Sequence, residues 1–325
     1  MDKYLVTGAA GFIGSVVAEK LLQQGAGVVG IDNLNDAYDP RLKEYRIAKL
    51  KASPGFTFHK LDVSDQSILD DERLKGKGFK AVVNLAARAG VRESLKDPWV
   101  YLDTNTKGTL NLLEFCLQEG VNKLLLASTS SVYGKDAPLP TPETAQSSYP
   151  LQAYASSKKA AEVLAHAYHY LHGIDISVVR YFTVYGPAGR PDMVMFRFAK
   201  WIAEGETVHL FGDGEQSRGF TYVDDIAWGT IAALKPVGYE IFNLGGHEVI
   251  TINELIRILE GLLGKKAQIK AHPRHPADML TNHADVSKAL NMLGWKPQVT
   301  LEEGIKRLVD WYLAERSWAK DIKTD

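Results

Sequence analysis

Residues Thr7 to Gly14 read T-G-A-A-G-F-I-G and follow directly on the apolar run Tyr4-Leu5-Val6. A strand, a glycine-rich turn and a helix, in this order, present free backbone N–H groups to a pyrophosphate. Gly8 allows the tight turn, Gly11 lets the phosphates approach, and Gly14 lets the helix pack closely on the strand. The segment therefore predicts an α/β fold that binds a dinucleotide, in preference to a chance glycine turn in another α/β protein.

The residues after the turn indicate which dinucleotide is bound. An amphipathic helix follows the glycines, and the apolar strand Val28-Val29-Gly30-Ile31 ends at Asp32. An acidic residue at the tip of the second strand, roughly 20 residues after the glycines, is placed to accept hydrogen bonds from the adenosine ribose. Because the charge of Asp32 would repel a 2′-phosphate, the sequence predicts NAD as the cofactor and not NADP.

Composition narrows the possible partners. The chain has 325 residues with a formal net charge of −1, which gives no reason to expect binding to nucleic acid or to an anionic membrane. No apolar run approaches the roughly 20 residues of a membrane span. The first strand begins within a few residues of the N-terminus, so we expect no signal peptide. The single cysteine, Cys116, lies in an apolar pattern typical of a core residue, and we expect a cytoplasmic protein.

Buried strands alternate with amphipathic helices through the first half of the chain. Strands are predicted after the glycine turn at 28–31, 56–59, 80–86, 123–128 and 175–180, and long helices at 98–120 and 151–172. This alternation predicts a doubly wound parallel sheet of the Rossmann type, with helices on both faces. Ligands of such sheets lie beyond the carboxyl ends of the strands. The residues expected at those ends are Asp32, Asp62, Ala86, Ala87, Ser128, Thr129 and Tyr181.

The alternation becomes irregular beyond about residue 185. We therefore predict a dinucleotide-binding domain over residues 1–185 and a smaller mixed α/β lobe over 186–325, with crossovers of the chain between them. The smaller lobe would cover the mouth of the sheet and bind the substrate. The polar segment after Trp318 is expected to be frayed.

A second motif carries the chemistry. Tyr154 and Lys158 form a Y-x-x-x-K pattern on a predicted helix, which places the phenol and the ammonium on one face. A nearby ammonium and a positive nicotinamide ring both favour the phenolate, which makes the tyrosine a usable base. The strand before this helix ends in the hydroxyl-rich stretch Ser128 to Ser131. A hydroxyl there and the phenolate can share one substrate oxygen, so the pattern predicts proton transfer coupled to hydride transfer.

These motifs stand in a characteristic order. After the glycine turn come N-L-A-A, N-T-K-G-T-L-N-L-L-E, S-T-S-S-V-Y-G, Y-x-x-x-K, R-Y-F-T-V-Y-G-P and R-G-F-T-Y-V-D-D. The chain thereby resembles the extended short-chain dehydrogenase/reductases over nearly its whole length, and among them the nucleotide-sugar 4-epimerases. It is most similar to the UDP-glucuronate 4-epimerases in the loop 34–43, in A-R-A-G-V-R at 87–92 and in Y-G-P-A-G-R-P-D-M at 185–193.

The resemblance implies roles for individual residues. It implies that Thr129 is the catalytic hydroxyl, Tyr154 the base and Lys158 the residue that tunes it. The implied NAD contacts, in addition to Tyr154 and Lys158, are Gly8, Gly11, Phe12, Ile13, Gly14, Asp32, Asn33, Asp62, Val63, Leu85, Ala86, Ala87, Asn105, Ser128 and Tyr181. The implied substrate contacts are Arg88, Ser130, Ser131, Thr183, Arg190, Arg218, Arg274 and Asp278. The family also implies a homodimer formed through the helices 98–119 and 151–172.

The chain departs from the family at a few positions. Arg88 stands where glutamine is common, and the segment 272–278 has alanine where glycine is usual. Dehydratases of the superfamily carry an Asp-Glu pair after the catalytic threonine, and related decarboxylases carry a glutamate at the second position. This chain has Ser130 and Ser131 there. The nine histidines give no metal-binding pattern, because His166, His169 and His172 fit a solvated or packed helix face better.

The interpretation is an NAD-dependent 4-epimerase of a UDP-sugar, with UDP-glucuronate to UDP-galacturonate as the preferred reaction. Ser130, Ser131, Thr183 and Arg190 are the candidates for holding the substrate carboxylate. Interconversion of UDP-glucose and UDP-galactose is the first alternative. Decarboxylation of UDP-glucuronate and 4,6-dehydration are less favoured because the acids are missing, and a non-catalytic NAD sensor because Thr129, Tyr154 and Lys158 are intact.

Overall fold

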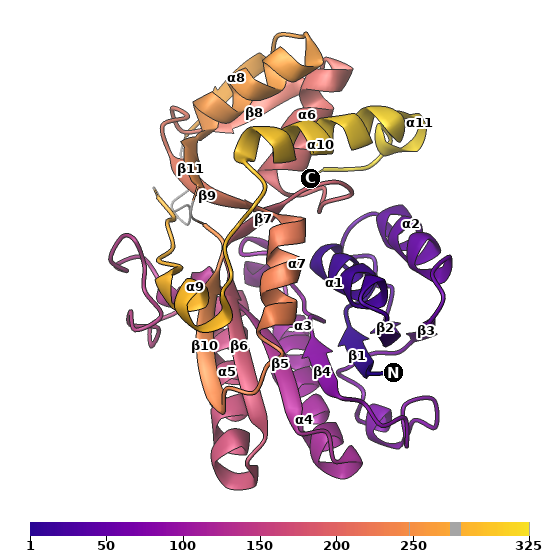
Figure 1. Ribbon diagram of the computed structural model, residues 1–325. Helices are drawn as coiled ribbons and strands as arrows, with labels where there is room; N and C mark the ends of the chain where they lie inside the picture. Colours follow the sequence, from indigo (N-terminus) through magenta and orange to yellow (C-terminus); the bar gives the residue numbers. More distant parts are fainter. Residues whose placement is uncertain (247, 274–280, 325) are drawn as a thin grey trace.

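Seven parallel strands form the large sheet of the computed structural model, which describes residues 1–246, 248–273 and 281–324 (Figure 1). The strand order is β10-β6-β5-β4-β1-β2-β3. The strands are β1 Lys3–Thr7, β2 Gly27–Asp32, β3 Phe56–Lys60, β4 Ala81–Asn84, β5 Lys123–Thr129, β6 Asp175–Tyr181 and β10 Tyr239–Leu244. The order reverses between β1 and β4, and a crevice at such a switch point is where open α/β sheets bind ligands.

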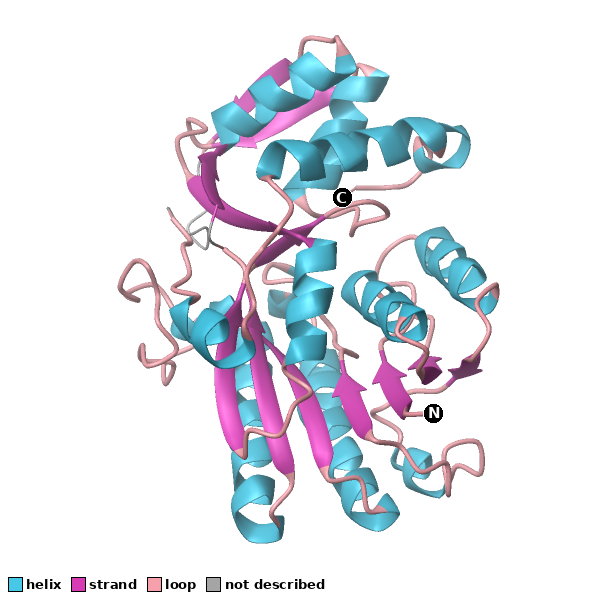
Figure 2. Ribbon diagram, in the orientation of Figure 1, coloured by secondary structure: helices cyan, strands magenta, loops and turns pink. Residues whose placement is uncertain are grey.

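Helices cover both faces of this sheet (Figure 2). The side chains of β1 alternate, so that Val6 belongs to one apolar cluster and Leu5 to another. The first cluster includes side chains of α1 Phe12–Gln23, α2 Pro40–Lys51, α7 Val223–Ala232 and α9 Ser287–Leu293. The second includes side chains of α4 Gly108–Glu119 and α5 Ala153–His172. Strands that are apolar on both sides therefore require the two helical layers.

The doubly wound parallel fold predicted from the sequence is confirmed. After β6 the chain leaves the large sheet and later returns to it, as the predicted crossovers between the lobes require, although the sequence did not predict a strand at 239–244. Residues 223–244 form α7 and β10, and β10 pairs in parallel with β6 at the edge of the large sheet. The chain thus crosses back after residue 185, and the division into 1–185 and 186–325 stays a prediction.

The helix predicted from residue 98 to 120 is continuous but not uniform. It begins as α3 Trp99–Tyr101, passes through a π-helical turn at Leu102–Lys107 and continues as α4. The π-helical turn carries Asn105, which is 1% exposed. Such turns often occur at functional sites because the extra residue redirects a side chain. Asn105 is consequently turned toward the carboxyl edge of the sheet.

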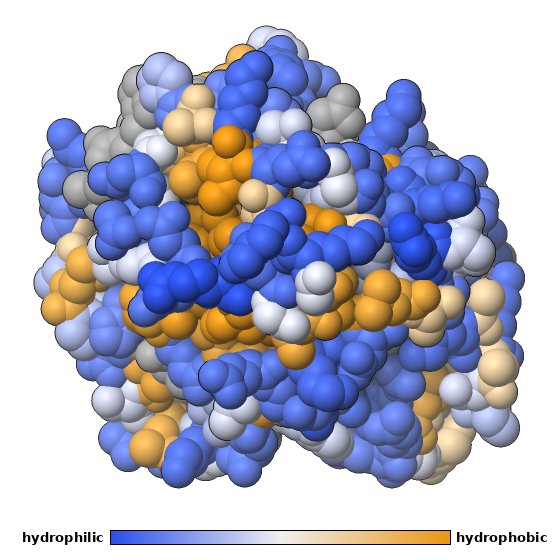
Figure 3. All heavy atoms as spheres, turned by 90° about the horizontal axis from the view of Figure 1, so that it is seen from above, coloured by the Kyte–Doolittle hydropathy of each residue, from blue (hydrophilic) through white to orange (hydrophobic). Residues whose placement is uncertain are grey.

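A smaller sheet system lies over the carboxyl ends of the large sheet (Figure 1). It has a core of its own, to which Trp201, Leu255 and Leu308 contribute. Its strands are β7 Thr183–Tyr185, β8 Thr207–Phe211, β9 Ser217–Tyr222, β11 Glu248–Thr251 and β12 Gln268–His272. Its helices are α6 Val194–Glu204, α8 Ile252–Leu263, α10 Leu301–Ala314 and α11 Arg316–Ala319. Seen from this end, apolar side chains show between ridges of polar ones (Figure 3).

The segment after Trp318 is packed, so the expectation of a frayed tail was wrong. Ile322 is 1% exposed, and the Thr324 hydroxyl accepts a hydrogen bond of 3.1 Å from Trp201 Nε1. Arg41 on α2 donates to the Asp321 carbonyl at 3.1 Å. The polar composition of the tail concealed one apolar anchor, Ile322, that ties α2 to the smaller lobe. None of the described helices is both long and apolar enough to cross a membrane.

A buried ion pair fixes α5 to the sheet. Arg180 on β6 donates to both carboxylate oxygens of Glu162, through Nε at 2.9 Å and Nη2 at 2.7 Å. Both side chains are 1% exposed. Burial opposes ionisation of Glu162, but the hydrogen bonds and charge of Arg180 and the hydroxyl of Ser128 hold the pKa of the carboxyl below its usual value. This pair sets the position of the helix that carries Tyr154 and Lys158.

Glu162→Gln is expected to lower the free energy of unfolding by about 3–5 kcal/mol, because it leaves the Arg180 guanidinium buried without its counter-charge. The folded pKa of Glu162 is depressed, so its contribution is present above the ordinary value of about 4.3 and is lost as the pH falls through the folded value. Urea denaturation from neutral to acid pH should show the gap between wild type and variant narrowing on acidification. Glu303→Gln, in an exposed pair with Arg307, is the control and should leave stability unchanged.

Candidate active site

The glycine-rich turn and the segment after β4 are pressed together at the switch point of the sheet. Gly8 has φ +67°, and a Cβ built on it would lie 2.7 Å from the Ala86 nitrogen. A Cβ on Gly14 would lie 2.2 Å from the Gly8 carbonyl oxygen. The Thr7 hydroxyl accepts a hydrogen bond of 3.1 Å from the Ala86 N–H and so holds the two segments in contact. Only glycine fits at these two positions.

Helix α1 begins at this turn with its amino end open to a ligand. Its N-cap is Gly11, which has no side chain that could cap the first N–H groups of the helix, those of Phe12 and Ile13. The uncapped N–H groups and the positive end of the helix dipole favour an anion. The turn therefore fits the pyrophosphate of a dinucleotide, as the sequence predicts.

Two carboxylates stand at the ends of β2 and β3. Asp32 accepts from the Leu34 N–H at 2.8 Å, and Asn33 donates to Asp62 at 2.8 Å. Burial opposes ionisation of Asp62, but hydrogen bonds from Asn33 and Ser64 hold its pKa below the usual value. Asp32 and Asn33 stay predicted contacts of the adenosine ribose, and Asp62 and Val63 stay predicted contacts of the adenine. Val63 is 4% exposed, and its carbonyl already accepts a hydrogen bond from Asn111 on α4. Val63 therefore offers a ligand apolar surface and not a free carbonyl.

Lys43 is a neighbour of Asp32 that the sequence analysis did not single out. Its Nζ lies 3.3 Å from Asp32 Oδ1 and 3.1 Å from Asn35 Oδ1, and both members of the ion pair are buried. The ammonium offsets part of the negative charge of Asp32. The sequence gives no signal for this contact, because Lys43 lies on the ordinary helix α2 and reaches the tip of β2 only in the folded chain.

Asn105 holds the backbone that follows β4. Its side-chain amide donates to the Arg88 carbonyl at 3.0 Å and to Ser157 Oγ at 2.9 Å, and its carbonyl accepts from the Arg88 N–H at 2.8 Å. Ser157 in turn donates to the Tyr154 carbonyl at 2.8 Å. Asn105 therefore links the segment of Leu85, Ala86 and Ala87, which is partly exposed at this edge, to the helix of the catalytic tyrosine.

The three predicted catalytic residues come together where β5 ends beside α5. Thr129 is the last residue of β5; its hydroxyl donates to Ser131 Oγ at 3.3 Å and is near enough to the Tyr154 phenol to lower the pKa of that phenol. Lys158 is 4% exposed and lies one helical turn after Tyr154, with Nζ 3.0 Å from the Ala127 carbonyl. The Tyr101 ring packs edge-on against the Tyr154 ring at 6.1 Å. This arrangement gives one hydroxyl and one phenol to a single substrate oxygen.

Burial and the neighbouring groups shift the pKa values of Tyr154 and Lys158 in opposite directions. Burial raises the pKa of Tyr154, and the Thr129 hydroxyl and the charge of Arg190 lower it. Burial lowers the pKa of Lys158 to about 8, although the charge of Glu162 opposes this shift. In the chain alone the phenol is therefore held neutral, and an added positive charge at this edge is required to make Tyr154 a base at neutral pH.

The hydroxyl-rich stretch continues past Thr129 as a 3-10 turn, Ser130–Tyr133. Ser131 donates its N–H to the Thr129 hydroxyl at 3.2 Å, and Asn282 reaches Ser130 Oγ at 3.4 Å. Thr183 opens strand β7 and is partly buried. Arg190 is 25% exposed and forms a two-fold hydrogen bond with Asp192 at 2.6 and 3.0 Å.

Two predicted cofactor contacts have their hydroxyls turned elsewhere. Ser128 donates to Glu162 at 2.6 Å, and the Tyr181 hydroxyl lies 2.8 Å from Thr230 on α7. Any contact that these two positions make with a cofactor would therefore use their main chain or ring. The sequence places both residues at strand ends, but alternation along a strand sends their side chains into the layers beneath.

The predicted contacts of the smaller lobe are described only in part. Arg218 lies on β9 and donates to the Ser217 carbonyl at 2.7 Å. Arg88 is partly exposed at the end of the segment after β4. Arg274 and Asp278 lie outside the described residues. Among the residues that the structure describes, no group of three His, Cys, Asp or Glu side chains could hold a metal ion.

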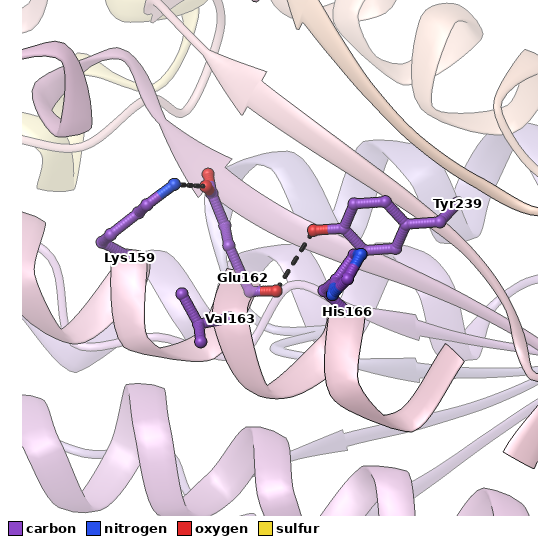
Figure 4. Close-up of a pocket in the computed structure, with 5 residues that line it drawn as sticks. All are labelled: Lys159, Glu162, Val163, His166 and Tyr239. Atoms are coloured by element: carbon purple, nitrogen blue, oxygen red, sulfur yellow. Dashed lines mark hydrogen bonds and ion pairs between the residues drawn. The ribbon is translucent and has the colours of Figure 1, made fainter. Parts of the chain in front are cut away.

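A separate hollow of about 240 Å³ lies between α5 and β10 at the edge of the large sheet (Figure 4). Its lining side chains bond to one another: Lys159 donates to Glu162 at 3.1 Å, and Tyr239 donates to the Glu162 carbonyl at 3.1 Å. No group from the glycine-rich turn or from the Thr129 stretch is among its lining residues. The side chains that line this hollow join α5 to β10, and the hollow is separate from the edge that carries Thr129.

The chain resembles known proteins over most of its length. Residues 4–245 match the model of the NAD dependent epimerase/dehydratase family. The UDP-glucuronate 4-epimerase of Thermodesulfobacterium geofontis is 54% identical over 99% of this chain and 100% of its own.

Two solved structures are similar to this chain in fold and sequence over nearly its whole length. The crystal structure of UDP-glucuronic acid 4-epimerase from Bacillus cereus with UDP-glucuronic acid and NAD superposes with TM-score 0.88 and 37% identity over 96% of this chain and 99% of that one. A UDP-glucose 4-epimerase from Thermotoga maritima, with UDP-glucose, has TM-score 0.87 and 33% identity over 97% and 99%.

Gly14→Ala is expected to abolish retention of a dinucleotide and to destabilise the fold by an amount on the order of 1–3 kcal/mol, because the added methyl group would overlap the Gly8 carbonyl. Nucleotide released from the denatured protein, measured by absorbance, and the thermal midpoint report the two effects. Gly261→Ala on α8, where a Cβ would meet nothing within 4 Å, is the control. Full nucleotide content in Gly14→Ala would contradict the role given to the turn.

Proposed function

The chain belongs to the NAD dependent epimerase/dehydratase family, and within it we propose that the protein converts UDP-glucuronate to UDP-galacturonate by inverting C4. The observation that carries this proposal is the Thr129 and Tyr154 pair at the edge of the sheet, followed by Ser130 and Ser131 instead of acids. This site can move one proton at one oxygen. In the described stretch after Thr129, residues 130 and 131 offer hydroxyls and no acid that could exchange a proton with a neighbouring carbon.

The glycine-rich turn, the carboxylate of Asp32 and the backbone held by Asn105 together fit NAD. NAD, when bound, takes up the hydride of C4 and returns it, so no net redox change occurs. Its positive ring also supplies the charge that the Tyr154 phenol needs in order to ionise. Lys158 is held against the Ala127 carbonyl within one helical turn of that phenol and is placed for the adjacent ribose.

The side chains act on the 4-hydroxyl of the sugar. Tyr154 accepts the proton of this hydroxyl as the 4-keto sugar forms, and Thr129 stays hydrogen-bonded to the same oxygen. The ketone must then turn over so that the hydride returns to its other face. Tyr154 gives the proton back to the same oxygen in this second half of the reaction. A single base therefore serves both directions.

The uronate substrate brings a particular hazard. Its 4-keto intermediate is a β-keto acid, which loses carbon dioxide readily when the carboxylate lies perpendicular to the plane of the ketone. Ser130, Ser131 and Thr183 are hydroxyl donors at the catalytic edge, and Arg190 adds a positive charge. We propose that these four groups hold the carboxylate in an orientation that is poor for decarboxylation.

The alternatives are weaker for specific reasons. A UDP-glucose 4-epimerase would use the same base and hydroxyl, but it would leave the hydroxyl donors at Ser130 and Ser131 without a substrate carboxylate to bind, whereas Arg190 already binds Asp192. A 4,6-dehydratase would need acids at residues 130 and 131, and a decarboxylase would need one at residue 131. A sensor without catalysis would not need Thr129, Tyr154 and Lys158 together at one edge of the sheet.

We propose that the protein is a cytoplasmic homodimer with its NAD domain over residues 1–185 and its sugar-binding lobe over 186–325. Large apolar side chains are exposed along α4 and α5, among them Leu117, Val163 and Leu171, and they support an interface there. The buried Cys116 is consistent with a reducing compartment. Sedimentation velocity tests the dimer and cell fractionation tests the compartment.

Incubation of the purified protein with UDP-glucuronate, followed by NMR of the sugar, tests the proposal directly. The expected product is UDP-galacturonate, with no carbon dioxide released. Tyr154→Phe should keep its fold and its NAD but lose roughly 10²–10⁴-fold in turnover, because the proton acceptor is gone. Tyr149→Phe, an exposed tyrosine before α5, is the matched control and should keep wild-type turnover. Turnover by Tyr154→Phe near the wild-type rate would overturn the assignment of the base.

Substrate preference separates the uronate from the neutral hexose. We expect a much higher kcat/KM for UDP-glucuronate than for UDP-glucose, because the unpaired carboxylate donors cost about 1–3 kcal/mol each. Ser131→Ala should slow epimerisation and raise leakage to the decarboxylated 4-keto pentose, which NMR detects. A higher kcat/KM for UDP-glucose would favour the alternative.

A further inference from the structure

Arg46 on α2 is a buried cation that joins three separate segments of the chain. It is 3% exposed, and all three of its nitrogens are used. Nη1 donates to the Ala10 carbonyl in the glycine-rich turn at 3.0 Å and to the Tyr38 hydroxyl at 2.7 Å. Nε and Nη2 both donate to the Ala188 carbonyl, at 3.1 and 2.6 Å, and Nη2 also reaches the Gly189 carbonyl at 3.3 Å.

The carbonyls that Arg46 binds immediately precede Arg190. Ala188 has φ +51°, a left-handed conformation that a residue with a Cβ adopts only when its surroundings impose it. The two hydrogen bonds from Arg46 to its carbonyl supply that constraint. A Cβ built on Gly189 would lie 3.7 Å from the Phe12 ring at the start of α1, so the loop lies close to the cofactor turn.

Arg190 connects this loop to the chemistry. Its charge acts on the Tyr154 phenol and on the Tyr101 phenol beside it. Thr129 and Lys158 are also near Tyr154, and Lys158 is held by the Ala127 carbonyl. Arg190 is paired with Asp192, which lies two residues further along the same loop. Arg190 is thus the charged group that reaches Tyr154 from the loop, and its position depends on the backbone before it.

We propose that Arg46 is a positioning residue of this active site, which clamps the 186–189 backbone to the glycine-rich turn and so holds Arg190 beside Tyr154. The inference rests on the proposed function, in which Tyr154 is the base. Arg46 touches neither the sugar nor the reacting atoms. Because Arg46 binds both the glycine-rich turn and the backbone before Arg190, these two segments are held together as one structural unit.

The central comparison uses Arg46→Met, which removes every donor, and Arg46→Lys, which keeps the charge but cannot span the same acceptors. Arg46→Met should lower kcat for UDP-glucuronate roughly tenfold, and KM should rise as well because Arg190 is also a proposed contact of the substrate carboxylate. The acid limb of its kcat–pH profile should move to higher pH, because the Arg190 charge no longer favours the phenolate. Arg46→Lys should have a kcat and an acid limb between those of Arg46→Met and wild type. If Arg46→Met does not fold, Arg46→Lys is used for the test.

A double mutant distinguishes positioning through Arg190 from a general loss of structure. Arg190→Gln alone should move the acid limb in the same direction. Adding Arg46→Met to Arg190→Gln should then move it no further, because both changes remove the same charge from Tyr154. Arg41→Met, on the same helix but exposed and bonded to Asp39, is the control and should keep the wild-type profile. An unchanged acid limb in folded Arg46→Met, or a full extra shift in the double mutant, overturns the proposal.

A measurement without substrate separates this inference from the proposed function. Ultraviolet difference titration of the NAD-bound protein against its Tyr154→Phe form reports ionisation of the Tyr154 phenol alone. The titration should move to higher pH in Arg46→Met. If wild type gives no product from UDP-glucuronate while this shift is present, the proposed function fails and the role of Arg46 stands. If wild type converts UDP-glucuronate but Arg46→Met shows no shift in this titration, the proposed function stands and the role of Arg46 is overturned.

Discussion

The contact between the turn after β1 and the segment after β4 is the constraint on which the rest of this site depends. The two strands are neighbours in the sheet but lie far apart in sequence, and the chain leaves them toward opposite halves of the molecule. Because Gly8 has no side chain, the Ala86 backbone can approach it, and the Thr7 hydroxyl holds that approach. The two main chains consequently meet at this switch point with no side chain between Gly8 and Ala86, which suits a phosphate-bearing ligand and leaves recognition of the sugar to side chains from later segments.

Helix α5 positions the Tyr154 phenol relative to this contact. Its position is set by the buried Glu162–Arg180 pair on one side and by Ser157, bonded to Asn105, on the other. Asn105 also fixes the backbone that follows β4. The phenol of Tyr154 is therefore held in register with the same segment that closes the glycine-rich turn. Burial alone would keep this phenol neutral, so its use as a base depends on charges brought close to it, from Arg190 and from the ring of bound NAD.

The sequence was sufficient for much of this picture because the determining residues act locally. Glycines in a strand–turn–helix, an acid at a strand tip and a tyrosine and lysine four residues apart each carry their geometry with them. The strand β10, the π-helical turn at Asn105 and the packed tail anchored by Ile322 were not predictable in this way. Each depends on contacts between distant segments. Lys43 and Arg46 were missed for the same reason, since a cation on an ordinary helix shows its partners only after folding.

Members of this family share one backbone, so the reaction of each must be set by a few side chains at the edge of the sheet. The fold of this chain matches a uronate epimerase and a glucose epimerase almost equally well. The outcome after the 4-keto sugar forms depends on which bonds can break next. An acid beside Thr129 would assist elimination or loss of the carboxylate, whereas Ser130 and Ser131 donate hydrogen bonds without taking a proton from carbon. With no acid at residues 130 and 131, return of the hydride is the step that the site assists, and C4 is inverted when the ketone has first turned its other face to the cofactor.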